Sequence, residues 1–205
     1  MEELGQVARE VAACTACVLS RTRHQTVPGS GDPNAEILFI GEAPGYHEDQ
    51  QGKPFIGPAG QFLDELLAAI GLRRENVFIA NVVKCRPPNN RDPQPDEIAA
   101  CDHFLQRQIA AIQPKVVVTL GRFSMTKFFP GETISRIHGR ARRQGDVLYF
   151  PSYHPAAALH QPALRRTIEE DFKKLPDLIA SLKAESKAEL TEEPPTQSAT
   201  QLQLF

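Results

Sequence analysis

The chain has 205 residues, of which 41% are hydrophobic and 23% charged, and its formal net charge is −2. A chain of this length can bury one substantial core, and the spacing of its elements indicates one domain rather than two. The first residues are charged and amphipathic, and no apolar window reaches membrane-spanning length, so we expect neither a secretory signal nor a membrane protein and predict a cytoplasmic location.

An N-terminal helical stretch is predicted to end in the sequence CTAC, which contains Cys14 and Cys17. The other two cysteines of the chain are Cys85 and Cys101. In a reducing compartment, four cysteines are more often metal ligands or reactive groups than disulfides. A CxxC pair and two distant cysteines can form a tetrathiolate site for zinc or for a [4Fe–4S] cluster. Spacing alone does not choose between them, and four unrelated buried thiols remain the alternative.

Four short apolar runs, rich in β-branched or aromatic residues, have the composition of buried parallel strands. They are residues 36–41, 76–83, 115–121 and 147–153. Helical patterns lie between them. The apolar positions from Phe62 to Ile70 keep three- and four-residue spacing and stop at Gly71, a plausible C′ residue. A second such pattern runs from Ile98 to Ile112 and follows Asp96, a candidate N-cap.

Strands that alternate with helices predict an α/β fold with a parallel sheet covered on both faces. We therefore expect a three-layer α/β/α sandwich around a central, mainly parallel sheet of four strands. In such folds the functional residues lie in loops beyond the carboxyl ends of the strands.

The stretch after the first predicted strand, GEAPGYHEDQQGKPFIGPAG, has five glycines and three prolines in twenty residues. This composition predicts a loop whose backbone closely approaches another group. The loop lacks the GxxxxGK[ST] pattern of nucleotide-binding loops and does not fit the dinucleotide fingerprint. Some other ligand is therefore expected at this edge of the sheet.

Basic side chains cluster in three predicted loops. These clusters are Lys84, Arg86 and Arg91; Arg136, Arg140, Arg142 and Arg143; and Arg165 with Arg166. Such loops suit a phosphate backbone, although ordinary solvated charge is the alternative for any one cluster.

The glycine-rich loop resembles the first motif of the uracil-DNA glycosylase superfamily, in the form typical of family 4, the iron–sulfur members. NVVKCRPPNNRDP after the second strand and YHPAAAL after the fourth continue the resemblance in order, over about residues 10–182. The resemblance implies a monofunctional glycosylase that hydrolyses the N-glycosidic bond of deoxyuridine in single- or double-stranded DNA. It would release uracil and leave an abasic site for base-excision repair.

The resemblance also implies a cofactor and its ligands. Cys14, Cys17, Cys85 and Cys101 match the four cysteines that hold one [4Fe–4S] cluster in family 4. We expect the cluster to be structural and to tie the N-terminal helix to the loop after the second strand.

Cleavage of this bond requires stabilisation of a uracil anion and an oxocarbenium-like sugar, in a pocket that receives a flipped base. By resemblance, Phe55 stacks on the base, Asn81 reads its N3–H and O4 edge, and His154 donates a hydrogen bond to O2. An amide suits the second task because only an amide offers a donor and an acceptor together.

Two glutamates complete the predicted site. Glu48 matches a family residue thought to crowd the methyl group of thymine, and Glu42 is assigned to activation of water or stabilisation of the sugar cation. Glu42 is also assigned to catalysis with His154, and Gly41 and Ala43 are assigned to the uracil-binding loop.

We expect DNA contacts from Lys84, Arg86 and Arg91, and we expect Leu159 to fill the gap left by the flipped base. His160 stands where relatives commonly have an arginine, so Arg165 or its neighbour is expected to replace that phosphate contact.

The segment CRPPNNRDP lacks the histidine with which a related group of uracil binders traps its product covalently, which favours turnover over trapping. A non-catalytic binder or a redox carrier is the alternative function. Four cysteines can form only one cluster, which argues against electron transfer as the main role.

We divide the chain into a glycosylase domain, residues 1–183, and a disordered acidic tail, residues 184–205, with four glutamates and one lysine. The tail ends in QLQLF, which resembles the bacterial sliding-clamp-binding motif QL[SD]LF except at its third position. By that resemblance Gln201, Leu202, Leu204 and Phe205 bind a clamp, with chance similarity as the alternative. We expect the protein to be a monomer.

Overall fold

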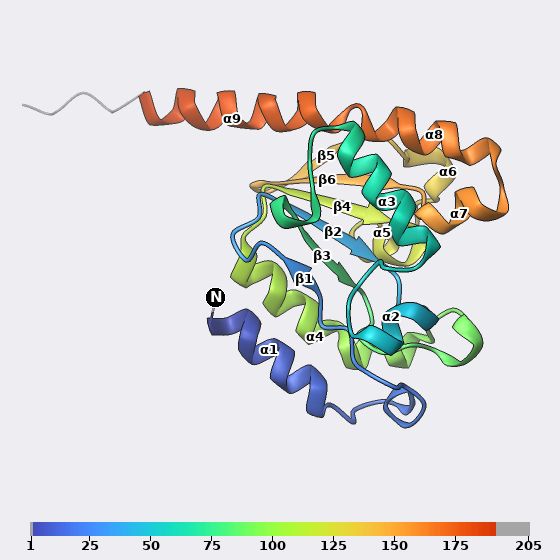
Figure 1. The fold of residues 1–205 in the computed structure, drawn as a ribbon. Coiled ribbons are helices and arrows are strands. Elements are labelled where there is room, and N and C mark those ends of the chain that lie inside the picture. The colour runs from blue at the N-terminus through green and yellow to red at the C-terminus, as the bar shows by residue number, and fades with distance from the viewer. Residues whose placement is uncertain (1, 192–205) are drawn as a thin grey trace, which may run out of the picture.

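The computed structural model describes residues 2–191, with side chains up to residue 184. At its centre is a six-stranded sheet of order β1-β3-β2-β4-β6-β5 (Figure 1). The four inner strands are parallel, as predicted, and are β3 (Phe78–Asn81), β2 (Ile37–Gly41), β4 (Val116–Leu120) and β6 (Val147–Ser152).

The predicted number of four strands is wrong, because an antiparallel strand flanks each edge of the sheet. These edge strands are β1 (Ser30–Gly31) and β5 (Arg142–Gln144). Both are short and fully exposed, so neither carries the apolar run that marks a buried strand. The α/β class of the prediction is confirmed.

Helices cover both faces of the sheet (Figure 1). One face packs against α1 (Glu2–Ala13) and α4 (Pro95–Ile112), and the other against α3 (Pro58–Ala69), α8 (Ala163–Phe172) and α9 (Leu175–Thr191). The remaining helical elements are α2 (Tyr46–Gln51), α5 (Arg122–Phe128), α6 (Ile134–Ile137), α7 (Pro155–His160), η1 (Val18–Arg21), η2 (Arg74–Asn76) and η3 (Pro88–Asn90).

The side chains of β2 divide the core between the two faces. Leu38 and Ile40 pack with α1 and α4, whereas Ile37 and Phe39 pack with α3, α8 and α9. Every residue of β2 is buried, which explains why the strand appears in the sequence as a continuous apolar run.

Of the two predicted helix ends, the one at Gly71 is confirmed and the one at Asp96 is wrong. The helix before Gly71 is confirmed, and Gly71 adopts a φ of 74° while its N–H bonds to Ala68 O at 3.1 Å. Asp96, however, is not the N-cap of α4. The cap residue is Gln94, whose N–H donates to the carboxylate of Glu97 at 2.7 Å.

The predicted disorder of residues 184–205 is wrong for its first part, because α9 continues to Thr191. The acidic composition of this part does not prevent helix formation, since Ala, Glu, Lys and Leu are all strong helix formers. The predicted clamp-binding residues 201–205 lie outside the described residues. No helix within residues 2–191 is long and apolar enough to cross a membrane.

Candidate active site and cysteine cavity

A cavity of about 500 Å³ lies where the parallel strands end. It is bounded by the loop after β2, the end of β3, the approach to α4, and α7. Of the seven residues predicted for catalysis or uracil binding, six line it: Glu42, Ala43, Glu48, Phe55, Asn81 and His154. The sheet therefore brings together residues that lie up to about one hundred positions apart in the chain, as expected for a site beyond the carboxyl ends of strands.

Gly41, the seventh predicted residue, lies beneath two of these side chains. It pairs in register with Asn81 across β2 and β3. A Cβ atom on Gly41 would lie 2.4 Å from Asn81 Oδ1 and 2.6 Å from the ring of Phe55. Only glycine lets both side chains approach so closely, so Gly41 shapes the floor of the cavity.

Asn81 is buried with its polar atoms unused. Its side chain is 1% exposed, and neither Oδ1 nor Nδ2 has a hydrogen-bond partner among the described residues. A buried amide without partners typically costs about 1–3 kcal/mol per unsatisfied group. An amide that faces a cavity in this state is ready to bind a ligand edge with one donor and one acceptor.

The ring of Phe55 packs against the ring of His154, with centroids 5.4 Å apart and planes at 27°. Phe55 has a positive φ of 52°, which is uncommon for a bulky residue. Residues held in such conformations tend to lie at ligand sites, where the surrounding structure enforces them.

His154 is the N-cap residue of α7, and its Nδ1 accepts a hydrogen bond from Ala156 N at 3.1 Å. A neutral imidazole that accepts at Nδ1 carries its proton on Nε2. Burial lowers the pKa of His154 to about 4, although the charge of Glu48 opposes the shift. At neutral pH the side chain is therefore an uncharged hydrogen-bond donor.

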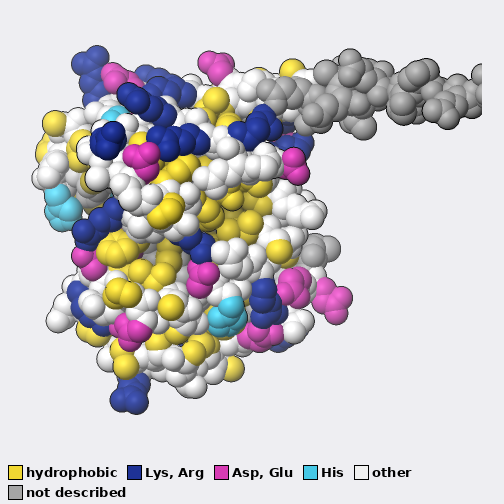
Figure 2. Space-filling model, turned by 180° about the vertical axis from the view of Figure 1, so that it is seen from behind, with side chains coloured by type: hydrophobic (Ala, Val, Ile, Leu, Met, Phe, Trp, Pro, Cys, Tyr) yellow, Lys and Arg dark blue, Asp and Glu magenta, His cyan; other side chains and the backbone are white. Residues whose placement is uncertain are grey.

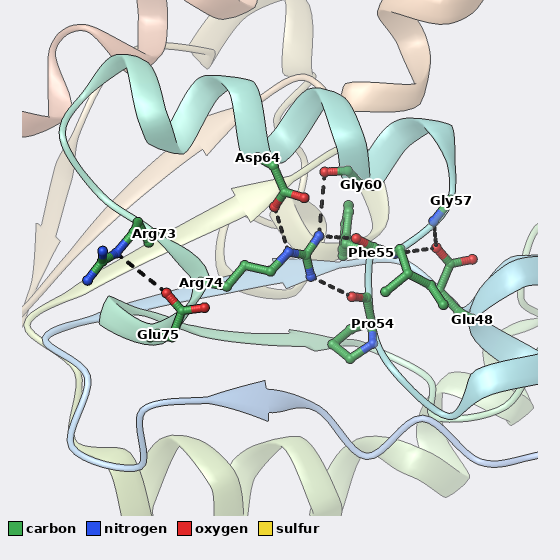
Figure 3. A network of polar contacts seen from close by, with 10 residues as sticks. Glu48, Pro54, Phe55, Gly57, Gly60, Asp64, Arg73, Arg74 and Glu75 are labelled. Carbon is green, nitrogen blue, oxygen red and sulfur yellow. Dashed lines mark hydrogen bonds and ion pairs between the residues drawn. The ribbon is translucent and has the colours of Figure 1, made fainter.

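The carboxylate of Glu48 joins the two ends of the glycine-rich loop. It accepts hydrogen bonds from Gly45 N at 3.1 Å and Ile56 N at 2.9 Å. It also accepts one from Gly57 N at 2.8 Å (Figure 3). This structural role of Glu48 was not predicted from the sequence, although an acidic residue at the third position of a short helix is a known capping signal.

Among residues 2–191, the carboxyl group of Glu42, unlike that of Glu48, is not held by backbone N–H groups. Within the described part of the chain, no hydrogen bond contributes to the pKa of its carboxyl group. Burial raises the pKa of Glu42 to about 7, with a further increase from the charge of Asp92 and an opposing effect of Arg122. Glu42 therefore changes protonation state near neutral pH, as a general base at this pH must.

The predicted phosphate contact of Lys84 is wrong. Its side chain is only 1% exposed, and Nζ donates to Asn81 O at 2.8 Å and to Gln108 Oε1 at 2.6 Å. In the sequence Lys84 resembles its basic neighbours, but the residue sits between β3 and α4 and anchors the backbone of Asn81. Nothing in the local pattern distinguishes such a lysine from an exposed one.

Three other predicted DNA contacts lie around the mouth of the cavity. Arg91 lines it and forms a two-pronged pair with Glu97, and Leu159 lines it with 49% of its surface exposed. Arg86 lies over the ring of Tyr46 at 5.2 Å. These side chains can reach a ligand outside the cavity.

Arg165 is engaged within the protein. It pairs with Glu65 and Glu169 and covers the ring of Phe62 at 4.4 Å, so a phosphate contact there stays a prediction. Figure 2 shows Lys and Arg side chains gathered over the upper left of that view, on the side where α6, α7 and α8 lie in Figure 1.

The four cysteines, all free thiols, line a second cavity between α1, η1 and α4. Three of the sulfurs accept hydrogen bonds: Cys14 from Ala16 N at 3.5 Å, Cys85 from Arg23 Nη1 at 3.1 Å, and Cys101 from Lys84 N at 3.3 Å. Arg23 was not foreseen from the sequence. Burial raises the pKa of Cys101 to about 11, with Lys84 opposing the shift.

The four thiols supply the donor set that a tetrathiolate centre requires. Within residues 2–184, no group of three His, Cys, Asp or Glu side chains is placed to hold a metal ion. N–H groups donate to three of the four sulfurs.

The chain is similar to known uracil-DNA glycosylases over most of its length. The family model of the Uracil DNA glycosylase superfamily matches residues 28–175. A Type-4 uracil-DNA glycosylase of Sulfurisphaera tokodaii is 49% identical over 193 residues, which cover 89% of this chain and 88% of the relative. The Type-4 enzyme of Archaeoglobus fulgidus is 50% identical over 187 residues, 87% and 94% of the two chains. That of Thermotoga maritima is 45% identical over 184 residues, 87% and 96%.

Proposed function

The chain belongs to the uracil-DNA glycosylase superfamily, and on this premise we propose that it removes uracil from DNA as a Type-4 enzyme. It hydrolyses the N-glycosidic bond of deoxyuridine, releases free uracil and leaves an abasic site for base-excision repair. Relatives named Type-4 uracil-DNA glycosylases at 49% and 50% identity over most of both chains support this assignment.

One observation carries the proposal within the site. The buried amide of Asn81 has no partner among the described residues and borders a cavity next to Phe55 and His154. Uracil presents an N3–H donor beside an O4 acceptor, which this amide matches. In this arrangement Phe55 offers an aromatic surface for the base.

His154 supports departure of the base. Its Nε2–H donates to uracil O2 as negative charge develops there, and the neutral state of the imidazole leaves this donor in place at neutral pH. Removal of a comparable oxyanion donor from an enzyme costs about 2.7–4 kcal/mol of transition-state stabilisation.

Glu42 acts as the general base for the attacking water. Its carboxylate accepts the proton of the water as the oxygen bonds to C1′ and the C1′–N1 bond breaks, with the bonding electron pair leaving on uracil. The pKa of about 7 supports this role, because the carboxylate form is populated at neutral pH and can still take up a proton.

Glu48 discriminates against thymine. Three backbone N–H groups hold its carboxylate, so it cannot easily move aside for a 5-methyl group. Thymine in normal DNA would therefore be excluded by a steric clash between its 5-methyl group and Glu48, rather than by loss of a hydrogen bond.

Cys14, Cys17, Cys85 and Cys101 would hold one [4Fe–4S] cluster. When bound, the cluster supplies a covalent cross-link between α1, the segment after β3, and α4. The cysteines themselves lie outside the base cavity, so their role in this proposal is to place the segment that carries Arg86 and Arg91.

Arg86, Arg91 and Leu159 are proposed to contact the DNA around the cavity mouth, and Arg165 to contact it farther out. Clamp binding by residues 201–205, a monomeric state and a cytoplasmic location stay predictions.

The test is incubation of the purified protein with an oligonucleotide that contains a single deoxyuridine, followed by alkali. Strand breaks are expected at the uracil in single- and double-stranded substrates, and none with thymine at the same position. Intact uracil-containing strands beside an active control enzyme would instead favour a non-catalytic binder.

A further inference from the structure

The guanidinium of Arg74 is the centre of a hydrogen-bond network behind the base cavity (Figure 3). Arg74 belongs to η2, just before β3. Its Nη1 donates to Pro54 O at 2.9 Å, and its Nη2 donates to Phe55 O and, more weakly, to Gly60 O at 3.5 Å. Its Nε pairs with Asp64 at 2.5 Å. Three of its four acceptors are therefore main-chain carbonyls on either side of the Phe55 ring.

Phe55 has a positive φ of 52°, and its carbonyl oxygen lies against Gly60 at the start of α3. A Cβ atom on Gly60 would lie 1.8 Å from Phe55 O, so the two backbone segments touch there. A carbonyl in such a crowded position needs a donor, and Arg74 supplies one.

The preceding residue offers a natural comparison. Arg73 is 78% exposed and pairs with Glu75 at 3.6 Å, as Figure 3 shows. Arg74 is 27% exposed and reaches inward across the loop. Two adjacent arginines thus differ in whether they touch the backbone of the base-stacking residue.

We propose that Arg74 is a positioning residue for uracil recognition, because it holds Phe55 in the left-handed conformation that points its ring into the base cavity. The inference rests on the proposed role of Phe55 as the surface on which uracil stacks. Arg74 itself lies behind the loop and is not among the residues that line the base cavity.

The planar fork of arginine is essential to this role. A lysine at position 74 keeps the positive charge near Asp64, but its three N–H donors radiate from one nitrogen. It therefore cannot reproduce the fork in which Nη1 reaches Pro54 O while Nη2 reaches Phe55 O. Arg74→Lys should therefore loosen Phe55 while preserving most of the local charge balance.

The experiment is a double-mutant cycle with Arg74→Lys and Phe55→Ala. The two readouts are the single-turnover rate on a uracil-containing duplex and the inhibition constant of free uracil, measured where circular dichroism shows every variant folded. Misplacement of a positioned group by about 1 Å can cost about 10²-fold, so we expect Arg74→Lys to lower the rate about ten- to a hundredfold and to weaken uracil inhibition. In the Phe55→Ala background, Arg74→Lys should change neither readout by more than about twofold, because coupled residues are not additive.

Two matched variants separate positioning from simple support of the fold. Arg73→Lys alters the exposed neighbour and should leave both readouts at the wild-type level. Asp64→Asn removes the ion pair but keeps the three carbonyl contacts, so it should retain most of the wild-type rate. This variant can be measured even if Arg74→Lys is hard to purify.

The results distinguish this inference from the proposed function. If Phe55→Ala has the wild-type rate, Phe55 has no stacking role and the premise is lost. If Phe55→Ala is slow but Arg74→Lys lowers the rate equally in both backgrounds, or if Asp64→Asn is as slow as Arg74→Lys, the function stands and Arg74 merely supports α3.

Discussion

Two segments meet at the carboxyl edge of the sheet and are held in different ways. The base loop, residues 41–60, is shaped by protein hydrogen bonds: its backbone N–H groups donate to Glu48, and its backbone carbonyls accept from Arg74. The Cys85 segment, residues 82–94, carries one of four clustered thiols and a buried lysine. Base recognition should therefore depend on hydrogen bonds within the protein, and DNA positioning on the clustered thiols. Substitutions should be able to disturb one without the other.

The largest effect is expected where the Cys85 segment loses its proposed cross-link. Cys85→Ala should abolish the brown colour and visible absorbance of an iron–sulfur protein. It should also lower the free energy of unfolding by about 2–5 kcal/mol, as loss of a native cross-link typically does. Iron analysis and thermal unfolding measure the two effects. Wild-type protein that contains stoichiometric zinc and no iron after anaerobic preparation would refute the cluster assignment.

The base loop should respond next most strongly to loss of Glu48. Glu48→Ala leaves three backbone N–H groups without their carboxylate acceptor, and hydrogen bonds to charged groups are worth about 1.5–3 kcal/mol each. Because water will replace part of this, we expect a loss of about 2–3 kcal/mol in unfolding free energy, with iron content unchanged. Glu65→Ala, on the exposed side of α3, is the control and should be nearly neutral. A loss of iron in Glu48→Ala would mean that the two segments are not independent.

The two segments also differ in how well sequence predicted them. The base loop has a dense local pattern, and four of its predicted site residues line the cavity together with Asn81 and His154. Lys84 was misjudged because its partner Gln108 lies on a helix 24 positions away, and no local pattern reveals that the pair is buried. Arg74 was missed for the same reason, since its acceptor Phe55 lies 19 positions earlier. Strand and helix periodicity report burial of apolar faces, whereas long-range polar contacts depend on packing.

Lys84 connects the Cys85 segment to the backbone of Asn81 and should give a smaller, selective effect. Lys84→Met keeps the length of the side chain but removes the donor to Asn81 O. Loss of two hydrogen bonds is offset by removal of a buried charge, so unfolding free energy should change by only about 1 kcal/mol. Because the backbone of Asn81 loses its anchor, uracil inhibition should weaken about fivefold to tenfold. Exposed Lys53→Met is the control, and unchanged uracil inhibition in Lys84→Met would leave Lys84 with a packing role alone.

The smallest effect concerns the protonation of Glu42, which both segments influence. Burial is the main cause of its raised pKa of about 7, and the charge of Asp92 in the Cys85 segment adds to it while Arg122 opposes it. If the carboxylate form of Glu42 is the active one, the single-turnover rate should rise with pH through the neutral range.

Asp92→Asn removes a negative charge and frees Arg122 from its ion pair, and both changes favour the carboxylate. The rising limb should therefore move to lower pH, by less than about one unit because burial remains. Arg122→Gln should move it the opposite way. A limb that stays in place in both variants, or that shifts with the opposite signs, would show that a group other than Glu42 controls the rate.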